Sequence, residues 1–129
     1  VPQLIATLRG DDDEAKEMAA DALGVLGPAA DEAADVLRPL LASEAEGVAD
    51  WSAIALGKIA GTDEALPRLM TIIRERQGRN IRVQAAEALG NIGPKARTAL
   101  PLLHSALDDP DEDFRHAVEG AIAFIEDEV

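Results

Sequence analysis

Small and apolar residues recur at helical intervals in the middle of the chain. Between residues 46 and 60 this set comprises Val48, Ser52, Ala55, Leu56 and Ile59. At 3.6 residues per turn these positions form one stripe along an α-helix. A second apolar set follows at 65–73, which reads Ala-Leu-Pro-Arg-Leu-Met-Thr-Ile-Ile. The two sets together predict a pair of amphipathic helices.

The same two-helix pattern returns at a fixed step. Ala-Leu-Gly occupies residues 22–24, 55–57 and 88–90, 33 residues apart, and returns in altered form as Ala-Ile-Ala at 121–123. A repeat of this length indicates a stack of near-identical units. We therefore predict an all-α protein, a right-handed α-α superhelix or solenoid of eight helices. Their expected ranges are 2–9, 13–26, 30–43, 46–60, 63–75, 79–92, 96–108 and 112–127.

Residues at the expected boundaries agree with these helices. Gly-Pro at 27–28 and 93–94 is a stop signal, since glycine adopts the left-handed conformation after a helix and proline cannot continue one. Ser43 with Glu46 predicts a capping box, and Asp109 followed by proline predicts a cap and a first helical residue. The glycine of each Ala-Leu-Gly costs about 1 kcal/mol of helix propensity, so we expect a neighbouring helix to approach closely there.

Two segments carry a family resemblance. Residues 81–93 read Ile-Arg-Val-Gln-Ala-Ala-Glu-Ala-Leu-Gly-Asn-Ile-Gly, and residues 99–103 read Ala-Leu-Pro-Leu-Leu. They resemble HEAT repeats, in particular the HEAT-like variety named after phycobilisome lyases. The resemblance covers essentially the whole chain and implies a single armadillo-like repeat domain over 1–129, with the second helix of each repeat lining a concave surface. Ala49 replaces the arginine of this pattern, which predicts an interrupted arginine ladder in the second unit.

Composition narrows the possible functions. The net charge of −13 works against nucleic-acid binding, which depends on Lys and Arg neutralising phosphates. Acids gather at 11–14 and 108–113, each before an expected first helix, where they favour capping; an acidic edge for a basic partner is the alternative. The chain lacks cysteine, an apolar run long enough to cross a membrane and a signal peptide, so we expect a cytoplasmic protein without membrane contact.

The outward positions of the second helices form the candidate binding surface. It contains Arg38, Met70, Arg74 and His104. The surface is mixed, and its arginines add a basic streak that would suit an acidic or amphipathic peptide; a solvated face is the alternative. Trp51 borders the core stripe of its helix, where packing between helices competes with a role as a binding hot spot on the other side. The histidines, at 104 and 116, are expected on the surface. We predict no catalytic residues, no metal and no cofactor.

These observations favour a non-enzymatic module that binds a protein or peptide as a scaffold. The rival is a bilin lyase-like chromophore-attachment enzyme or chaperone, which would need a larger apolar pocket and more aromatics than the two phenylalanines and one tryptophan present.

The chain starts with a second helix and stops after a first helix. We therefore expect a fragment of a longer repeat protein, or weak end-to-end self-association through uncapped apolar flanks. The residues expected in these flanks are Val1, Leu4, Ile5 and Leu8 at the start and Val118, Ile122, Ile125 and Val129 at the end.

Overall fold

The computed structural model describes residues 1–126 and contains helices but no strands over that range. The eight α-helices are α1 (Pro2–Leu8), α2 (Asp13–Leu26), α3 (Ala34–Leu40), α4 (Glu46–Ala60), α5 (Leu66–Glu75), α6 (Arg79–Ile92), α7 (Leu100–Ala106) and α8 (Glu112–Glu126). This confirms the all-α solenoid. The expected last residue of the eighth helix, 127, lies outside the described residues.

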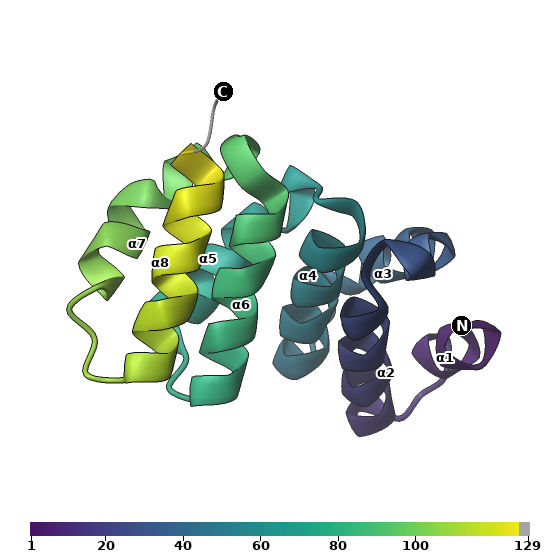
Figure 1. Cartoon of the computed structure of the whole chain (residues 1–129). Helices are drawn as coiled ribbons and strands as arrows, with labels where there is room; N and C mark the ends of the chain where they lie inside the picture. Colours follow the sequence, from purple (N-terminus) through teal and green to yellow (C-terminus); the bar gives the residue numbers. More distant parts are fainter. Residues whose placement is uncertain (127–129) are drawn as a thin grey trace.

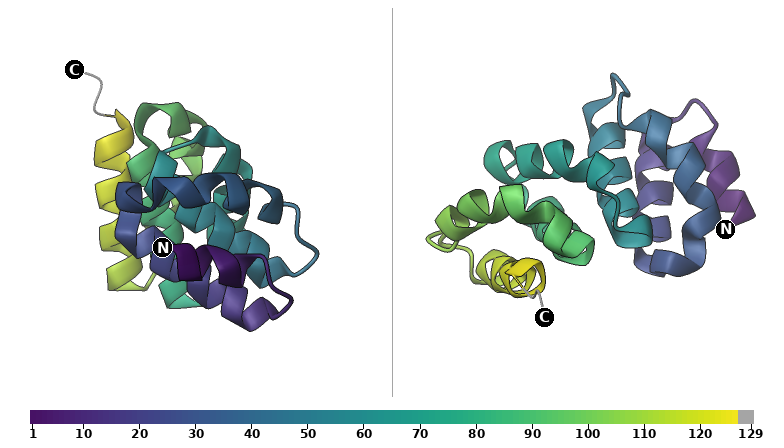
Figure 2. Two further views of the ribbon diagram at one scale, coloured as in Figure 1. Left: turned by 90° about the vertical axis from the view of Figure 1, so that its right-hand side faces the viewer. Right: turned by 90° about the horizontal axis from the view of Figure 1, so that it is seen from above.

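The helices form two layers. We call α2, α4, α6 and α8 the A helices and α1, α3, α5 and α7 the B helices. The A helices stand side by side in one row; in this view α5 lies behind the row, and α7 and α1 lie beyond its two ends (Figure 1). The two further views show the stack running from α1 at one end to α8 at the other (Figure 2). Each helix therefore packs mainly on its neighbours in the stack.

The B helices start differently from the prediction. Instead of single helices from 30 and 96, the structure has the 3₁₀ segments η1 (Gly27–Ala33) and η3 (Gly93–Ala99) before α3 and α7. Gly27 and Gly93 have φ of 63° and 76°, which ends the preceding A helix, and the following proline starts a new helical turn. In the middle unit, which is one residue shorter here, only the three-residue η2 (Asp63–Ala65) precedes α5.

Two predicted helix caps are also wrong. Ser43 Oγ accepts a hydrogen bond from the Ala45 backbone N–H at 3.1 Å, so it closes a turn before α4 rather than a capping box with Glu46. Before α8 the cap is Asp111, which accepts from the backbone N–H of Phe114 at 3.2 Å. The helix therefore begins after Asp111 and not at the proline that follows Asp109.

The A helices touch through the glycine of Ala-Leu-Gly. A Cβ placed on Gly24 would lie 3.3 Å from Ala55 Cα, one on Gly57 would lie 2.9 Å from Ala88 Cβ, and one on Gly90 would lie 3.1 Å from Ala121 Cα. The intervening leucines, at positions 23, 56 and 89, are fully buried. The expected close approach is confirmed, and it explains why glycine occupies a position where helix propensity alone would favour alanine.

This contact predicts opposite effects for the same substitution at two helical glycines. Gly57→Ala places a methyl against Ala88, and the resulting overpacking costs about 1–3 kcal/mol, more than the gain in helix propensity. Gly120→Ala in α8 meets nothing within 4 Å, so it should stabilise the fold by about 1 kcal/mol. Urea unfolding of both variants checks the pair, and a more stable Gly57→Ala variant would contradict the packing argument.

Candidate functional site

Open grooves separate successive B helices. One, of about 390 Å³, lies between α3 and α5 and is lined by Leu41, Glu64, Pro67, Arg68 and Thr71. The other, of about 400 Å³, lies between α5 and α7 and is lined by Ile73, Arg74, Arg82, Leu102, Ser105, Ala106, Asp108 and Asp109. They form because the B helices contact one another much less than the A helices do.

The predicted binding residues lie on the B helices but do not converge on one cavity. Arg38 on α3 pairs with a residue that lines the α3–α5 groove, since its Nε lies 2.9 Å from Glu64 Oε1; its Nη1 lies 2.5 Å from Asp35 Oδ1. Glu64, and secondarily Asp35, raise the pKa of Arg38, and Arg38 lowers the pKa of Glu64. The Arg38 guanidinium therefore ties α3 to the start of the next B helix.

The other three predicted residues have different surroundings. Met70 is half-buried against the core. Arg74 is exposed, lines the α5–α7 groove and forms no ion pair with any described residue. His104 is exposed on α7, with its Nε2 3.5 Å from Glu126 Oε2. Of the predicted set, Arg74 is thus the cation left available in a groove.

Trp51 lies on α4 and is half-buried against the hydrophobic core. This position agrees with packing between helices, and part of the indole is left exposed at the surface.

A buried charge cluster was missed by the sequence analysis. Asp50 is 2% exposed and accepts hydrogen bonds from Arg76 Nε at 2.8 Å and Arg68 Nη1 at 3.3 Å. The Arg76 guanidinium also lies 3.1 Å from Glu46. Asp50, and to a lesser degree Glu46, raise the pKa of Arg76.

The cluster replaces the interrupted arginine ladder with a pair of reversed polarity. Arg82 on α6 pairs at 2.9 Å with Asp109, which lies in the loop before α8. In the unit where Ala49 takes the arginine position, the A helix offers Asp50 and the loop offers Arg76. Arg76 occupies the loop position that corresponds to Asp109 in the repeat. In the sequence, this reversal is indicated only by alanine at the arginine position, Ala49, followed directly by an acid, Asp50.

Asp109 and Asp111 fix the loop before α8. Asp109 accepts from the Asp111 backbone N–H at 2.9 Å, and the Arg82 guanidinium that binds it stacks 4.0 Å from the Phe114 ring centre. The Asp111 N–H and then Arg82 lower the pKa of Asp109. Arg79, whose Nε lies 2.6 Å from Asp111 Oδ2, lowers the pKa of Asp111 together with the backbone N–H groups at the helix start.

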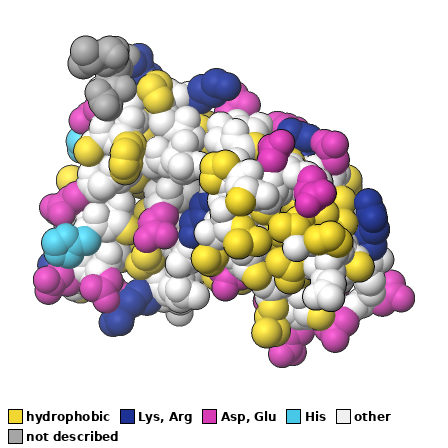
Figure 3. Space-filling view, turned by 45° about the vertical axis from the view of Figure 1, so that its right-hand side comes forward, with side chains coloured by type: hydrophobic (Ala, Val, Ile, Leu, Met, Phe, Trp, Pro, Cys, Tyr) yellow, Lys and Arg dark blue, Asp and Glu magenta, His cyan; other side chains and the backbone are white. Residues whose placement is uncertain are grey.

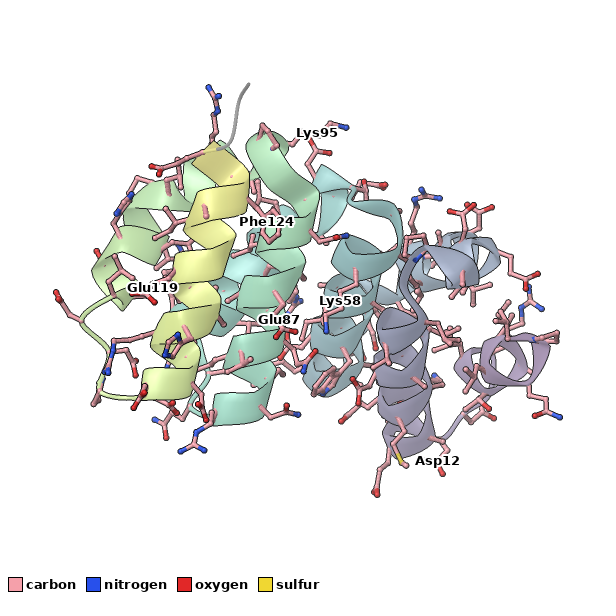
Figure 4. The ribbon with its side chains drawn as sticks, in the orientation of Figure 1. Asp12, Lys58, Glu87, Lys95, Glu119 and Phe124 are labelled. Atoms are coloured by element: carbon pink, nitrogen blue, oxygen red, sulfur yellow. The ribbon has the colours of Figure 1, made fainter. Side chains whose placement is uncertain are left out.

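The row of A helices carries a second feature, centred on Phe124. The residue is 66% exposed, and its ring lies between α8 and α6 (Figure 4), against the backbone of Gly90. A hollow of about 180 Å³ beside it is lined by Glu87, Gly90, His116, Ala117, Gly120 and Ala121. Between α4 and α6, the Lys58 side chain forms a hydrogen bond with Gln84, and its Nζ lies 3.4 Å from Glu87 Oε1.

The predicted apolar flank at the end of the stack is wrong. Val118, Ile122 and Ile125 are buried, because this side of α8 faces α6 and α7; Val129 lies outside the described residues. At the start, Leu8 is also buried, while Val1, Leu4 and Ile5 are half-buried. The large exposed hydrophobic residues are instead Met18, Val25, Leu26 and Phe124.

Among the residues that the structure describes, no group of three or more His, Cys, Asp or Glu side chains could hold a metal ion. Within the same range, no helix has the length and apolarity needed to cross a bilayer.

The family model described as HEAT repeats matches residues 1–82 and 72–129. No curated protein matches the chain in sequence.

The buried cluster generates a stability prediction. Asp50→Ala leaves the partly buried Arg76 without its main partner and should lower the free energy of unfolding by about 3 kcal/mol. Asp35→Ala removes a carboxylate that is 90% exposed and should change the free energy of unfolding by less than about 0.5 kcal/mol. The Asp50→Ala/Arg76→Ala double variant should cost less than the sum of the single variants, as a double-mutant cycle would measure. Additive effects would show that the two side chains are not coupled.

The lowered pKa of Asp111 gives a pH dependence. A carboxyl group whose pKa is lower in the folded state adds stability above its unfolded pKa of about 4 and loses it as pH falls through the folded value. Asp111→Asn keeps an N-cap but removes the charge. We expect this variant to be less stable than the parent at pH 7, with the difference shrinking below about pH 4. Urea titrations at pH 7 and in acid test this, and a constant difference would refute it.

Proposed function

We propose that this chain, which belongs to the family of HEAT repeats, is a non-enzymatic protein-interaction module that binds peptide segments on its B-helix face. HEAT repeats commonly serve protein–protein interaction. The fold favours this role, because a stack of helix pairs offers an extended surface on a rigid frame. The observation that carries the proposal is the α5–α7 groove with Arg74 at its edge.

The groove combines an apolar floor with four charged groups, of which Arg82 and Asp109 pair with each other. Ile73, Leu102 and Ala106 supply the apolar part. Arg74 and Asp108, both exposed, supply charges of opposite sign. An aliphatic side chain would fit the floor, and a carboxylate beside it would pair with Arg74. The preferred ligand is therefore a short amphipathic segment with an acidic residue next to an aliphatic one.

The protein's net negative charge does not prevent this contact. Charges separated by more than about 8 Å are largely screened at physiological salt, so the field of the distant acids is weak at the groove. Most other basic side chains are already paired: Arg38, Arg68, Arg76, Arg79 and Arg82 each lie within salt-bridge distance of an acid. Arg74 differs from them in having no such partner within residues 1–126.

Peptide selection on the purified chain would test the proposal. Ligands selected from a random peptide display library should combine acidic and aliphatic residues. Arg74→Glu, which reverses the groove charge, should weaken their binding about tenfold, as expected for loss of an interface contact worth more than 1 kcal/mol. Ser105→Trp should also block them, because Ser105 is exposed and lines the groove.

Arg9→Glu is the matched control, because Arg9 is an exposed arginine at the far end of the stack. It should leave binding unchanged. Ligands that tolerate both groove substitutions but are lost with Trp51→Ala would place the interface on the A helices and defeat this assignment.

The finer resemblance to the phycobilisome-lyase variety of repeat rests on residues 81–93. Chromophore attachment is the function it would favour. Incubating the chain with a free bilin and recording the absorbance spectrum separates the two functions. A module that binds peptides and not the bilin should leave the bilin spectrum unaltered.

A further inference from the structure

Small residues leave a hollow at the junction of α6 and α8. The glycine of each Ala-Leu-Gly admits a neighbouring A helix, whereas a Cβ on Gly120 of α8 would meet nothing within 4 Å. Glycine in a helix interior is unfavourable, and at Gly120 no packing contact within the chain offsets this cost. Together with Ala117, Gly120 leaves open the hollow of about 180 Å³ beside Phe124.

The repeat places larger side chains at the same two positions of the other A helices. On α4 these positions hold Trp51, which is half-buried, and Ile54, which is 1% exposed. On α6 they hold Gln84 and Glu87, and the Lys58 side chain contacts both. At the two earlier junctions, residues of the chain itself therefore occupy the place that stays unfilled between α6 and α8.

The hollow is apolar and has an aromatic wall. Its lining includes Gly90, Ala117 and Ala121 besides Gly120 and Phe124. Phe124 also lines a second hollow, of about 420 Å³, which extends to the Gly-Pro turn after α6. Aromatic rings attract one another in edge-to-face and offset-stacked arrangements. The exposed ring of Phe124 therefore favours a second aromatic ring as the occupant.

The hollow does not belong to the side of α8 on which a further repeat would stack. The glycine of each Ala-Leu-Gly faces the following A helix, and Ala123 holds this position on α8. Ala121 and Phe124 instead contact Gly90 of the preceding A helix. A unit stacked against Ala123 would therefore use a different side of α8 from the side that borders the hollow.

The ionisable side chains around the hollow are mainly acidic. Glu87 borders it and is exposed. His116, also at its edge, lies 3.8 Å from both Glu112 and Glu119, and within residues 1–126 neither acid forms another ion pair. In the space-filling view, the surface over α6 and α8 carries a few hydrophobic side chains with acidic side chains around them (Figure 3). A cationic group beside the hollow would thus meet charge of the opposite sign.

We propose that this hollow binds an aromatic side chain from a segment of a protein partner, with lysine or arginine next to the aromatic residue. The aromatic ring takes the place that the Trp51 side chain has on α4 and packs against Phe124. The basic residue pairs with the acids beside His116. The hollow lies on the row of A helices, away from the groove between α5 and α7, so the two sites succeed or fail independently.

A second copy of this chain fits the hollow less well. Phe114 is buried and Trp51 is half-buried, so the exposed aromatic ring that a copy could offer is Phe124 itself. Inserting Phe124 of each copy into the other would bring the two acidic edges together. Like charges at an interface oppose association, and the charges therefore favour a basic partner segment.

The pentapeptide Gly-Lys-Trp-Lys-Gly, blocked at both ends, is the probe. Titrated into the ¹⁵N-labelled full chain, it should shift the NMR signals of the backbone amides that line the hollow, at Gly90, Ala117, Gly120 and Ala121. Gly-Lys-Ala-Lys-Gly should leave these signals in place. Gly-Glu-Trp-Glu-Gly should bind at least threefold more weakly at low salt, as for loss of exposed ion pairs, and the difference should vanish at high salt.

Variants of the chain test the hollow itself. Gly120→Ile supplies from within the side chain that Ile54 supplies on α4, and it should weaken binding of the tryptophan peptide at least tenfold. Circular dichroism should show that this variant keeps its helices. Ala123→Ile adds a similar side chain at an exposed position of α8 outside the hollow and should leave binding unchanged. Arg74→Glu, which tests the α5–α7 groove, should also leave it unchanged.

Three outcomes would overturn the proposal. The first is a tryptophan peptide that leaves the hollow signals in place, or that binds Gly120→Ile as well as the parent chain. The second is N-acetyl-tryptophan amide binding as tightly as the pentapeptide, which would make the hollow a site for small aromatic molecules. The third is concentration-dependent sedimentation of the chain alone that Gly120→Ile abolishes, which would make a second copy the occupant.

Discussion

Contact between a glycine on one A helix and an alanine on the next is the constraint on which the stack depends. It brings the A helices close enough for the leucine of each Ala-Leu-Gly to be fully buried between layers. The A helices therefore pack along their length, whereas the B helices meet one another only at their edges. The grooves between B helices follow from this difference. The candidate binding surface thus depends on packing on the opposite side of the molecule.

Ion pairs join the loops to the helices, and their polarity is interchangeable. In one unit Arg82 on the A helix pairs with Asp109 in the following loop. In the preceding unit the A helix supplies the acid, Asp50, and the equivalent loop position supplies the arginine, Arg76. Either arrangement neutralises a partly buried charge, which is the condition for placing one there. A repeat can therefore lose its arginine and keep the connection, provided that a residue of opposite charge changes with it.

The period and the apolar stripe predicted the helices well, because both arise from contacts that recur in every unit. The 3₁₀ starts of the B helices were missed because Gly-Pro signals the end of one helix without fixing how the next begins. The prediction of an apolar flank at the end of the stack is wrong because α6 and α7 both lie on the stripe of α8 that includes Ile122. Exposure at the end of a stack depends on which side of the last helix is free, which sequence periodicity does not specify.

The candidate site was predicted only in part, for a related reason. The spacing correctly placed Arg38 and Arg74 on B helices, but their environments depend on residues from other units. Glu64, which follows Arg38 by 26 positions, pairs with it, while Arg74 has no such partner among the described residues. An outward position in a repeat indicates that a side chain can reach solvent. Its charge is available to a ligand only where the neighbouring repeat has not already neutralised it.

The same reasoning distinguishes the two ends of the stack. Inside the stack, a helix start rich in acids faces arginine, as α8 faces Arg79. At α2 the equivalent acids remain, beside an apolar surface formed by Met18 and Val25. The free side of α8 instead combines the small residue Ala123 with acids such as Glu119. Because both ends are acidic, joining them would bring like charges together. The charge distribution of the repeats therefore opposes open-ended polymerisation of copies of this chain.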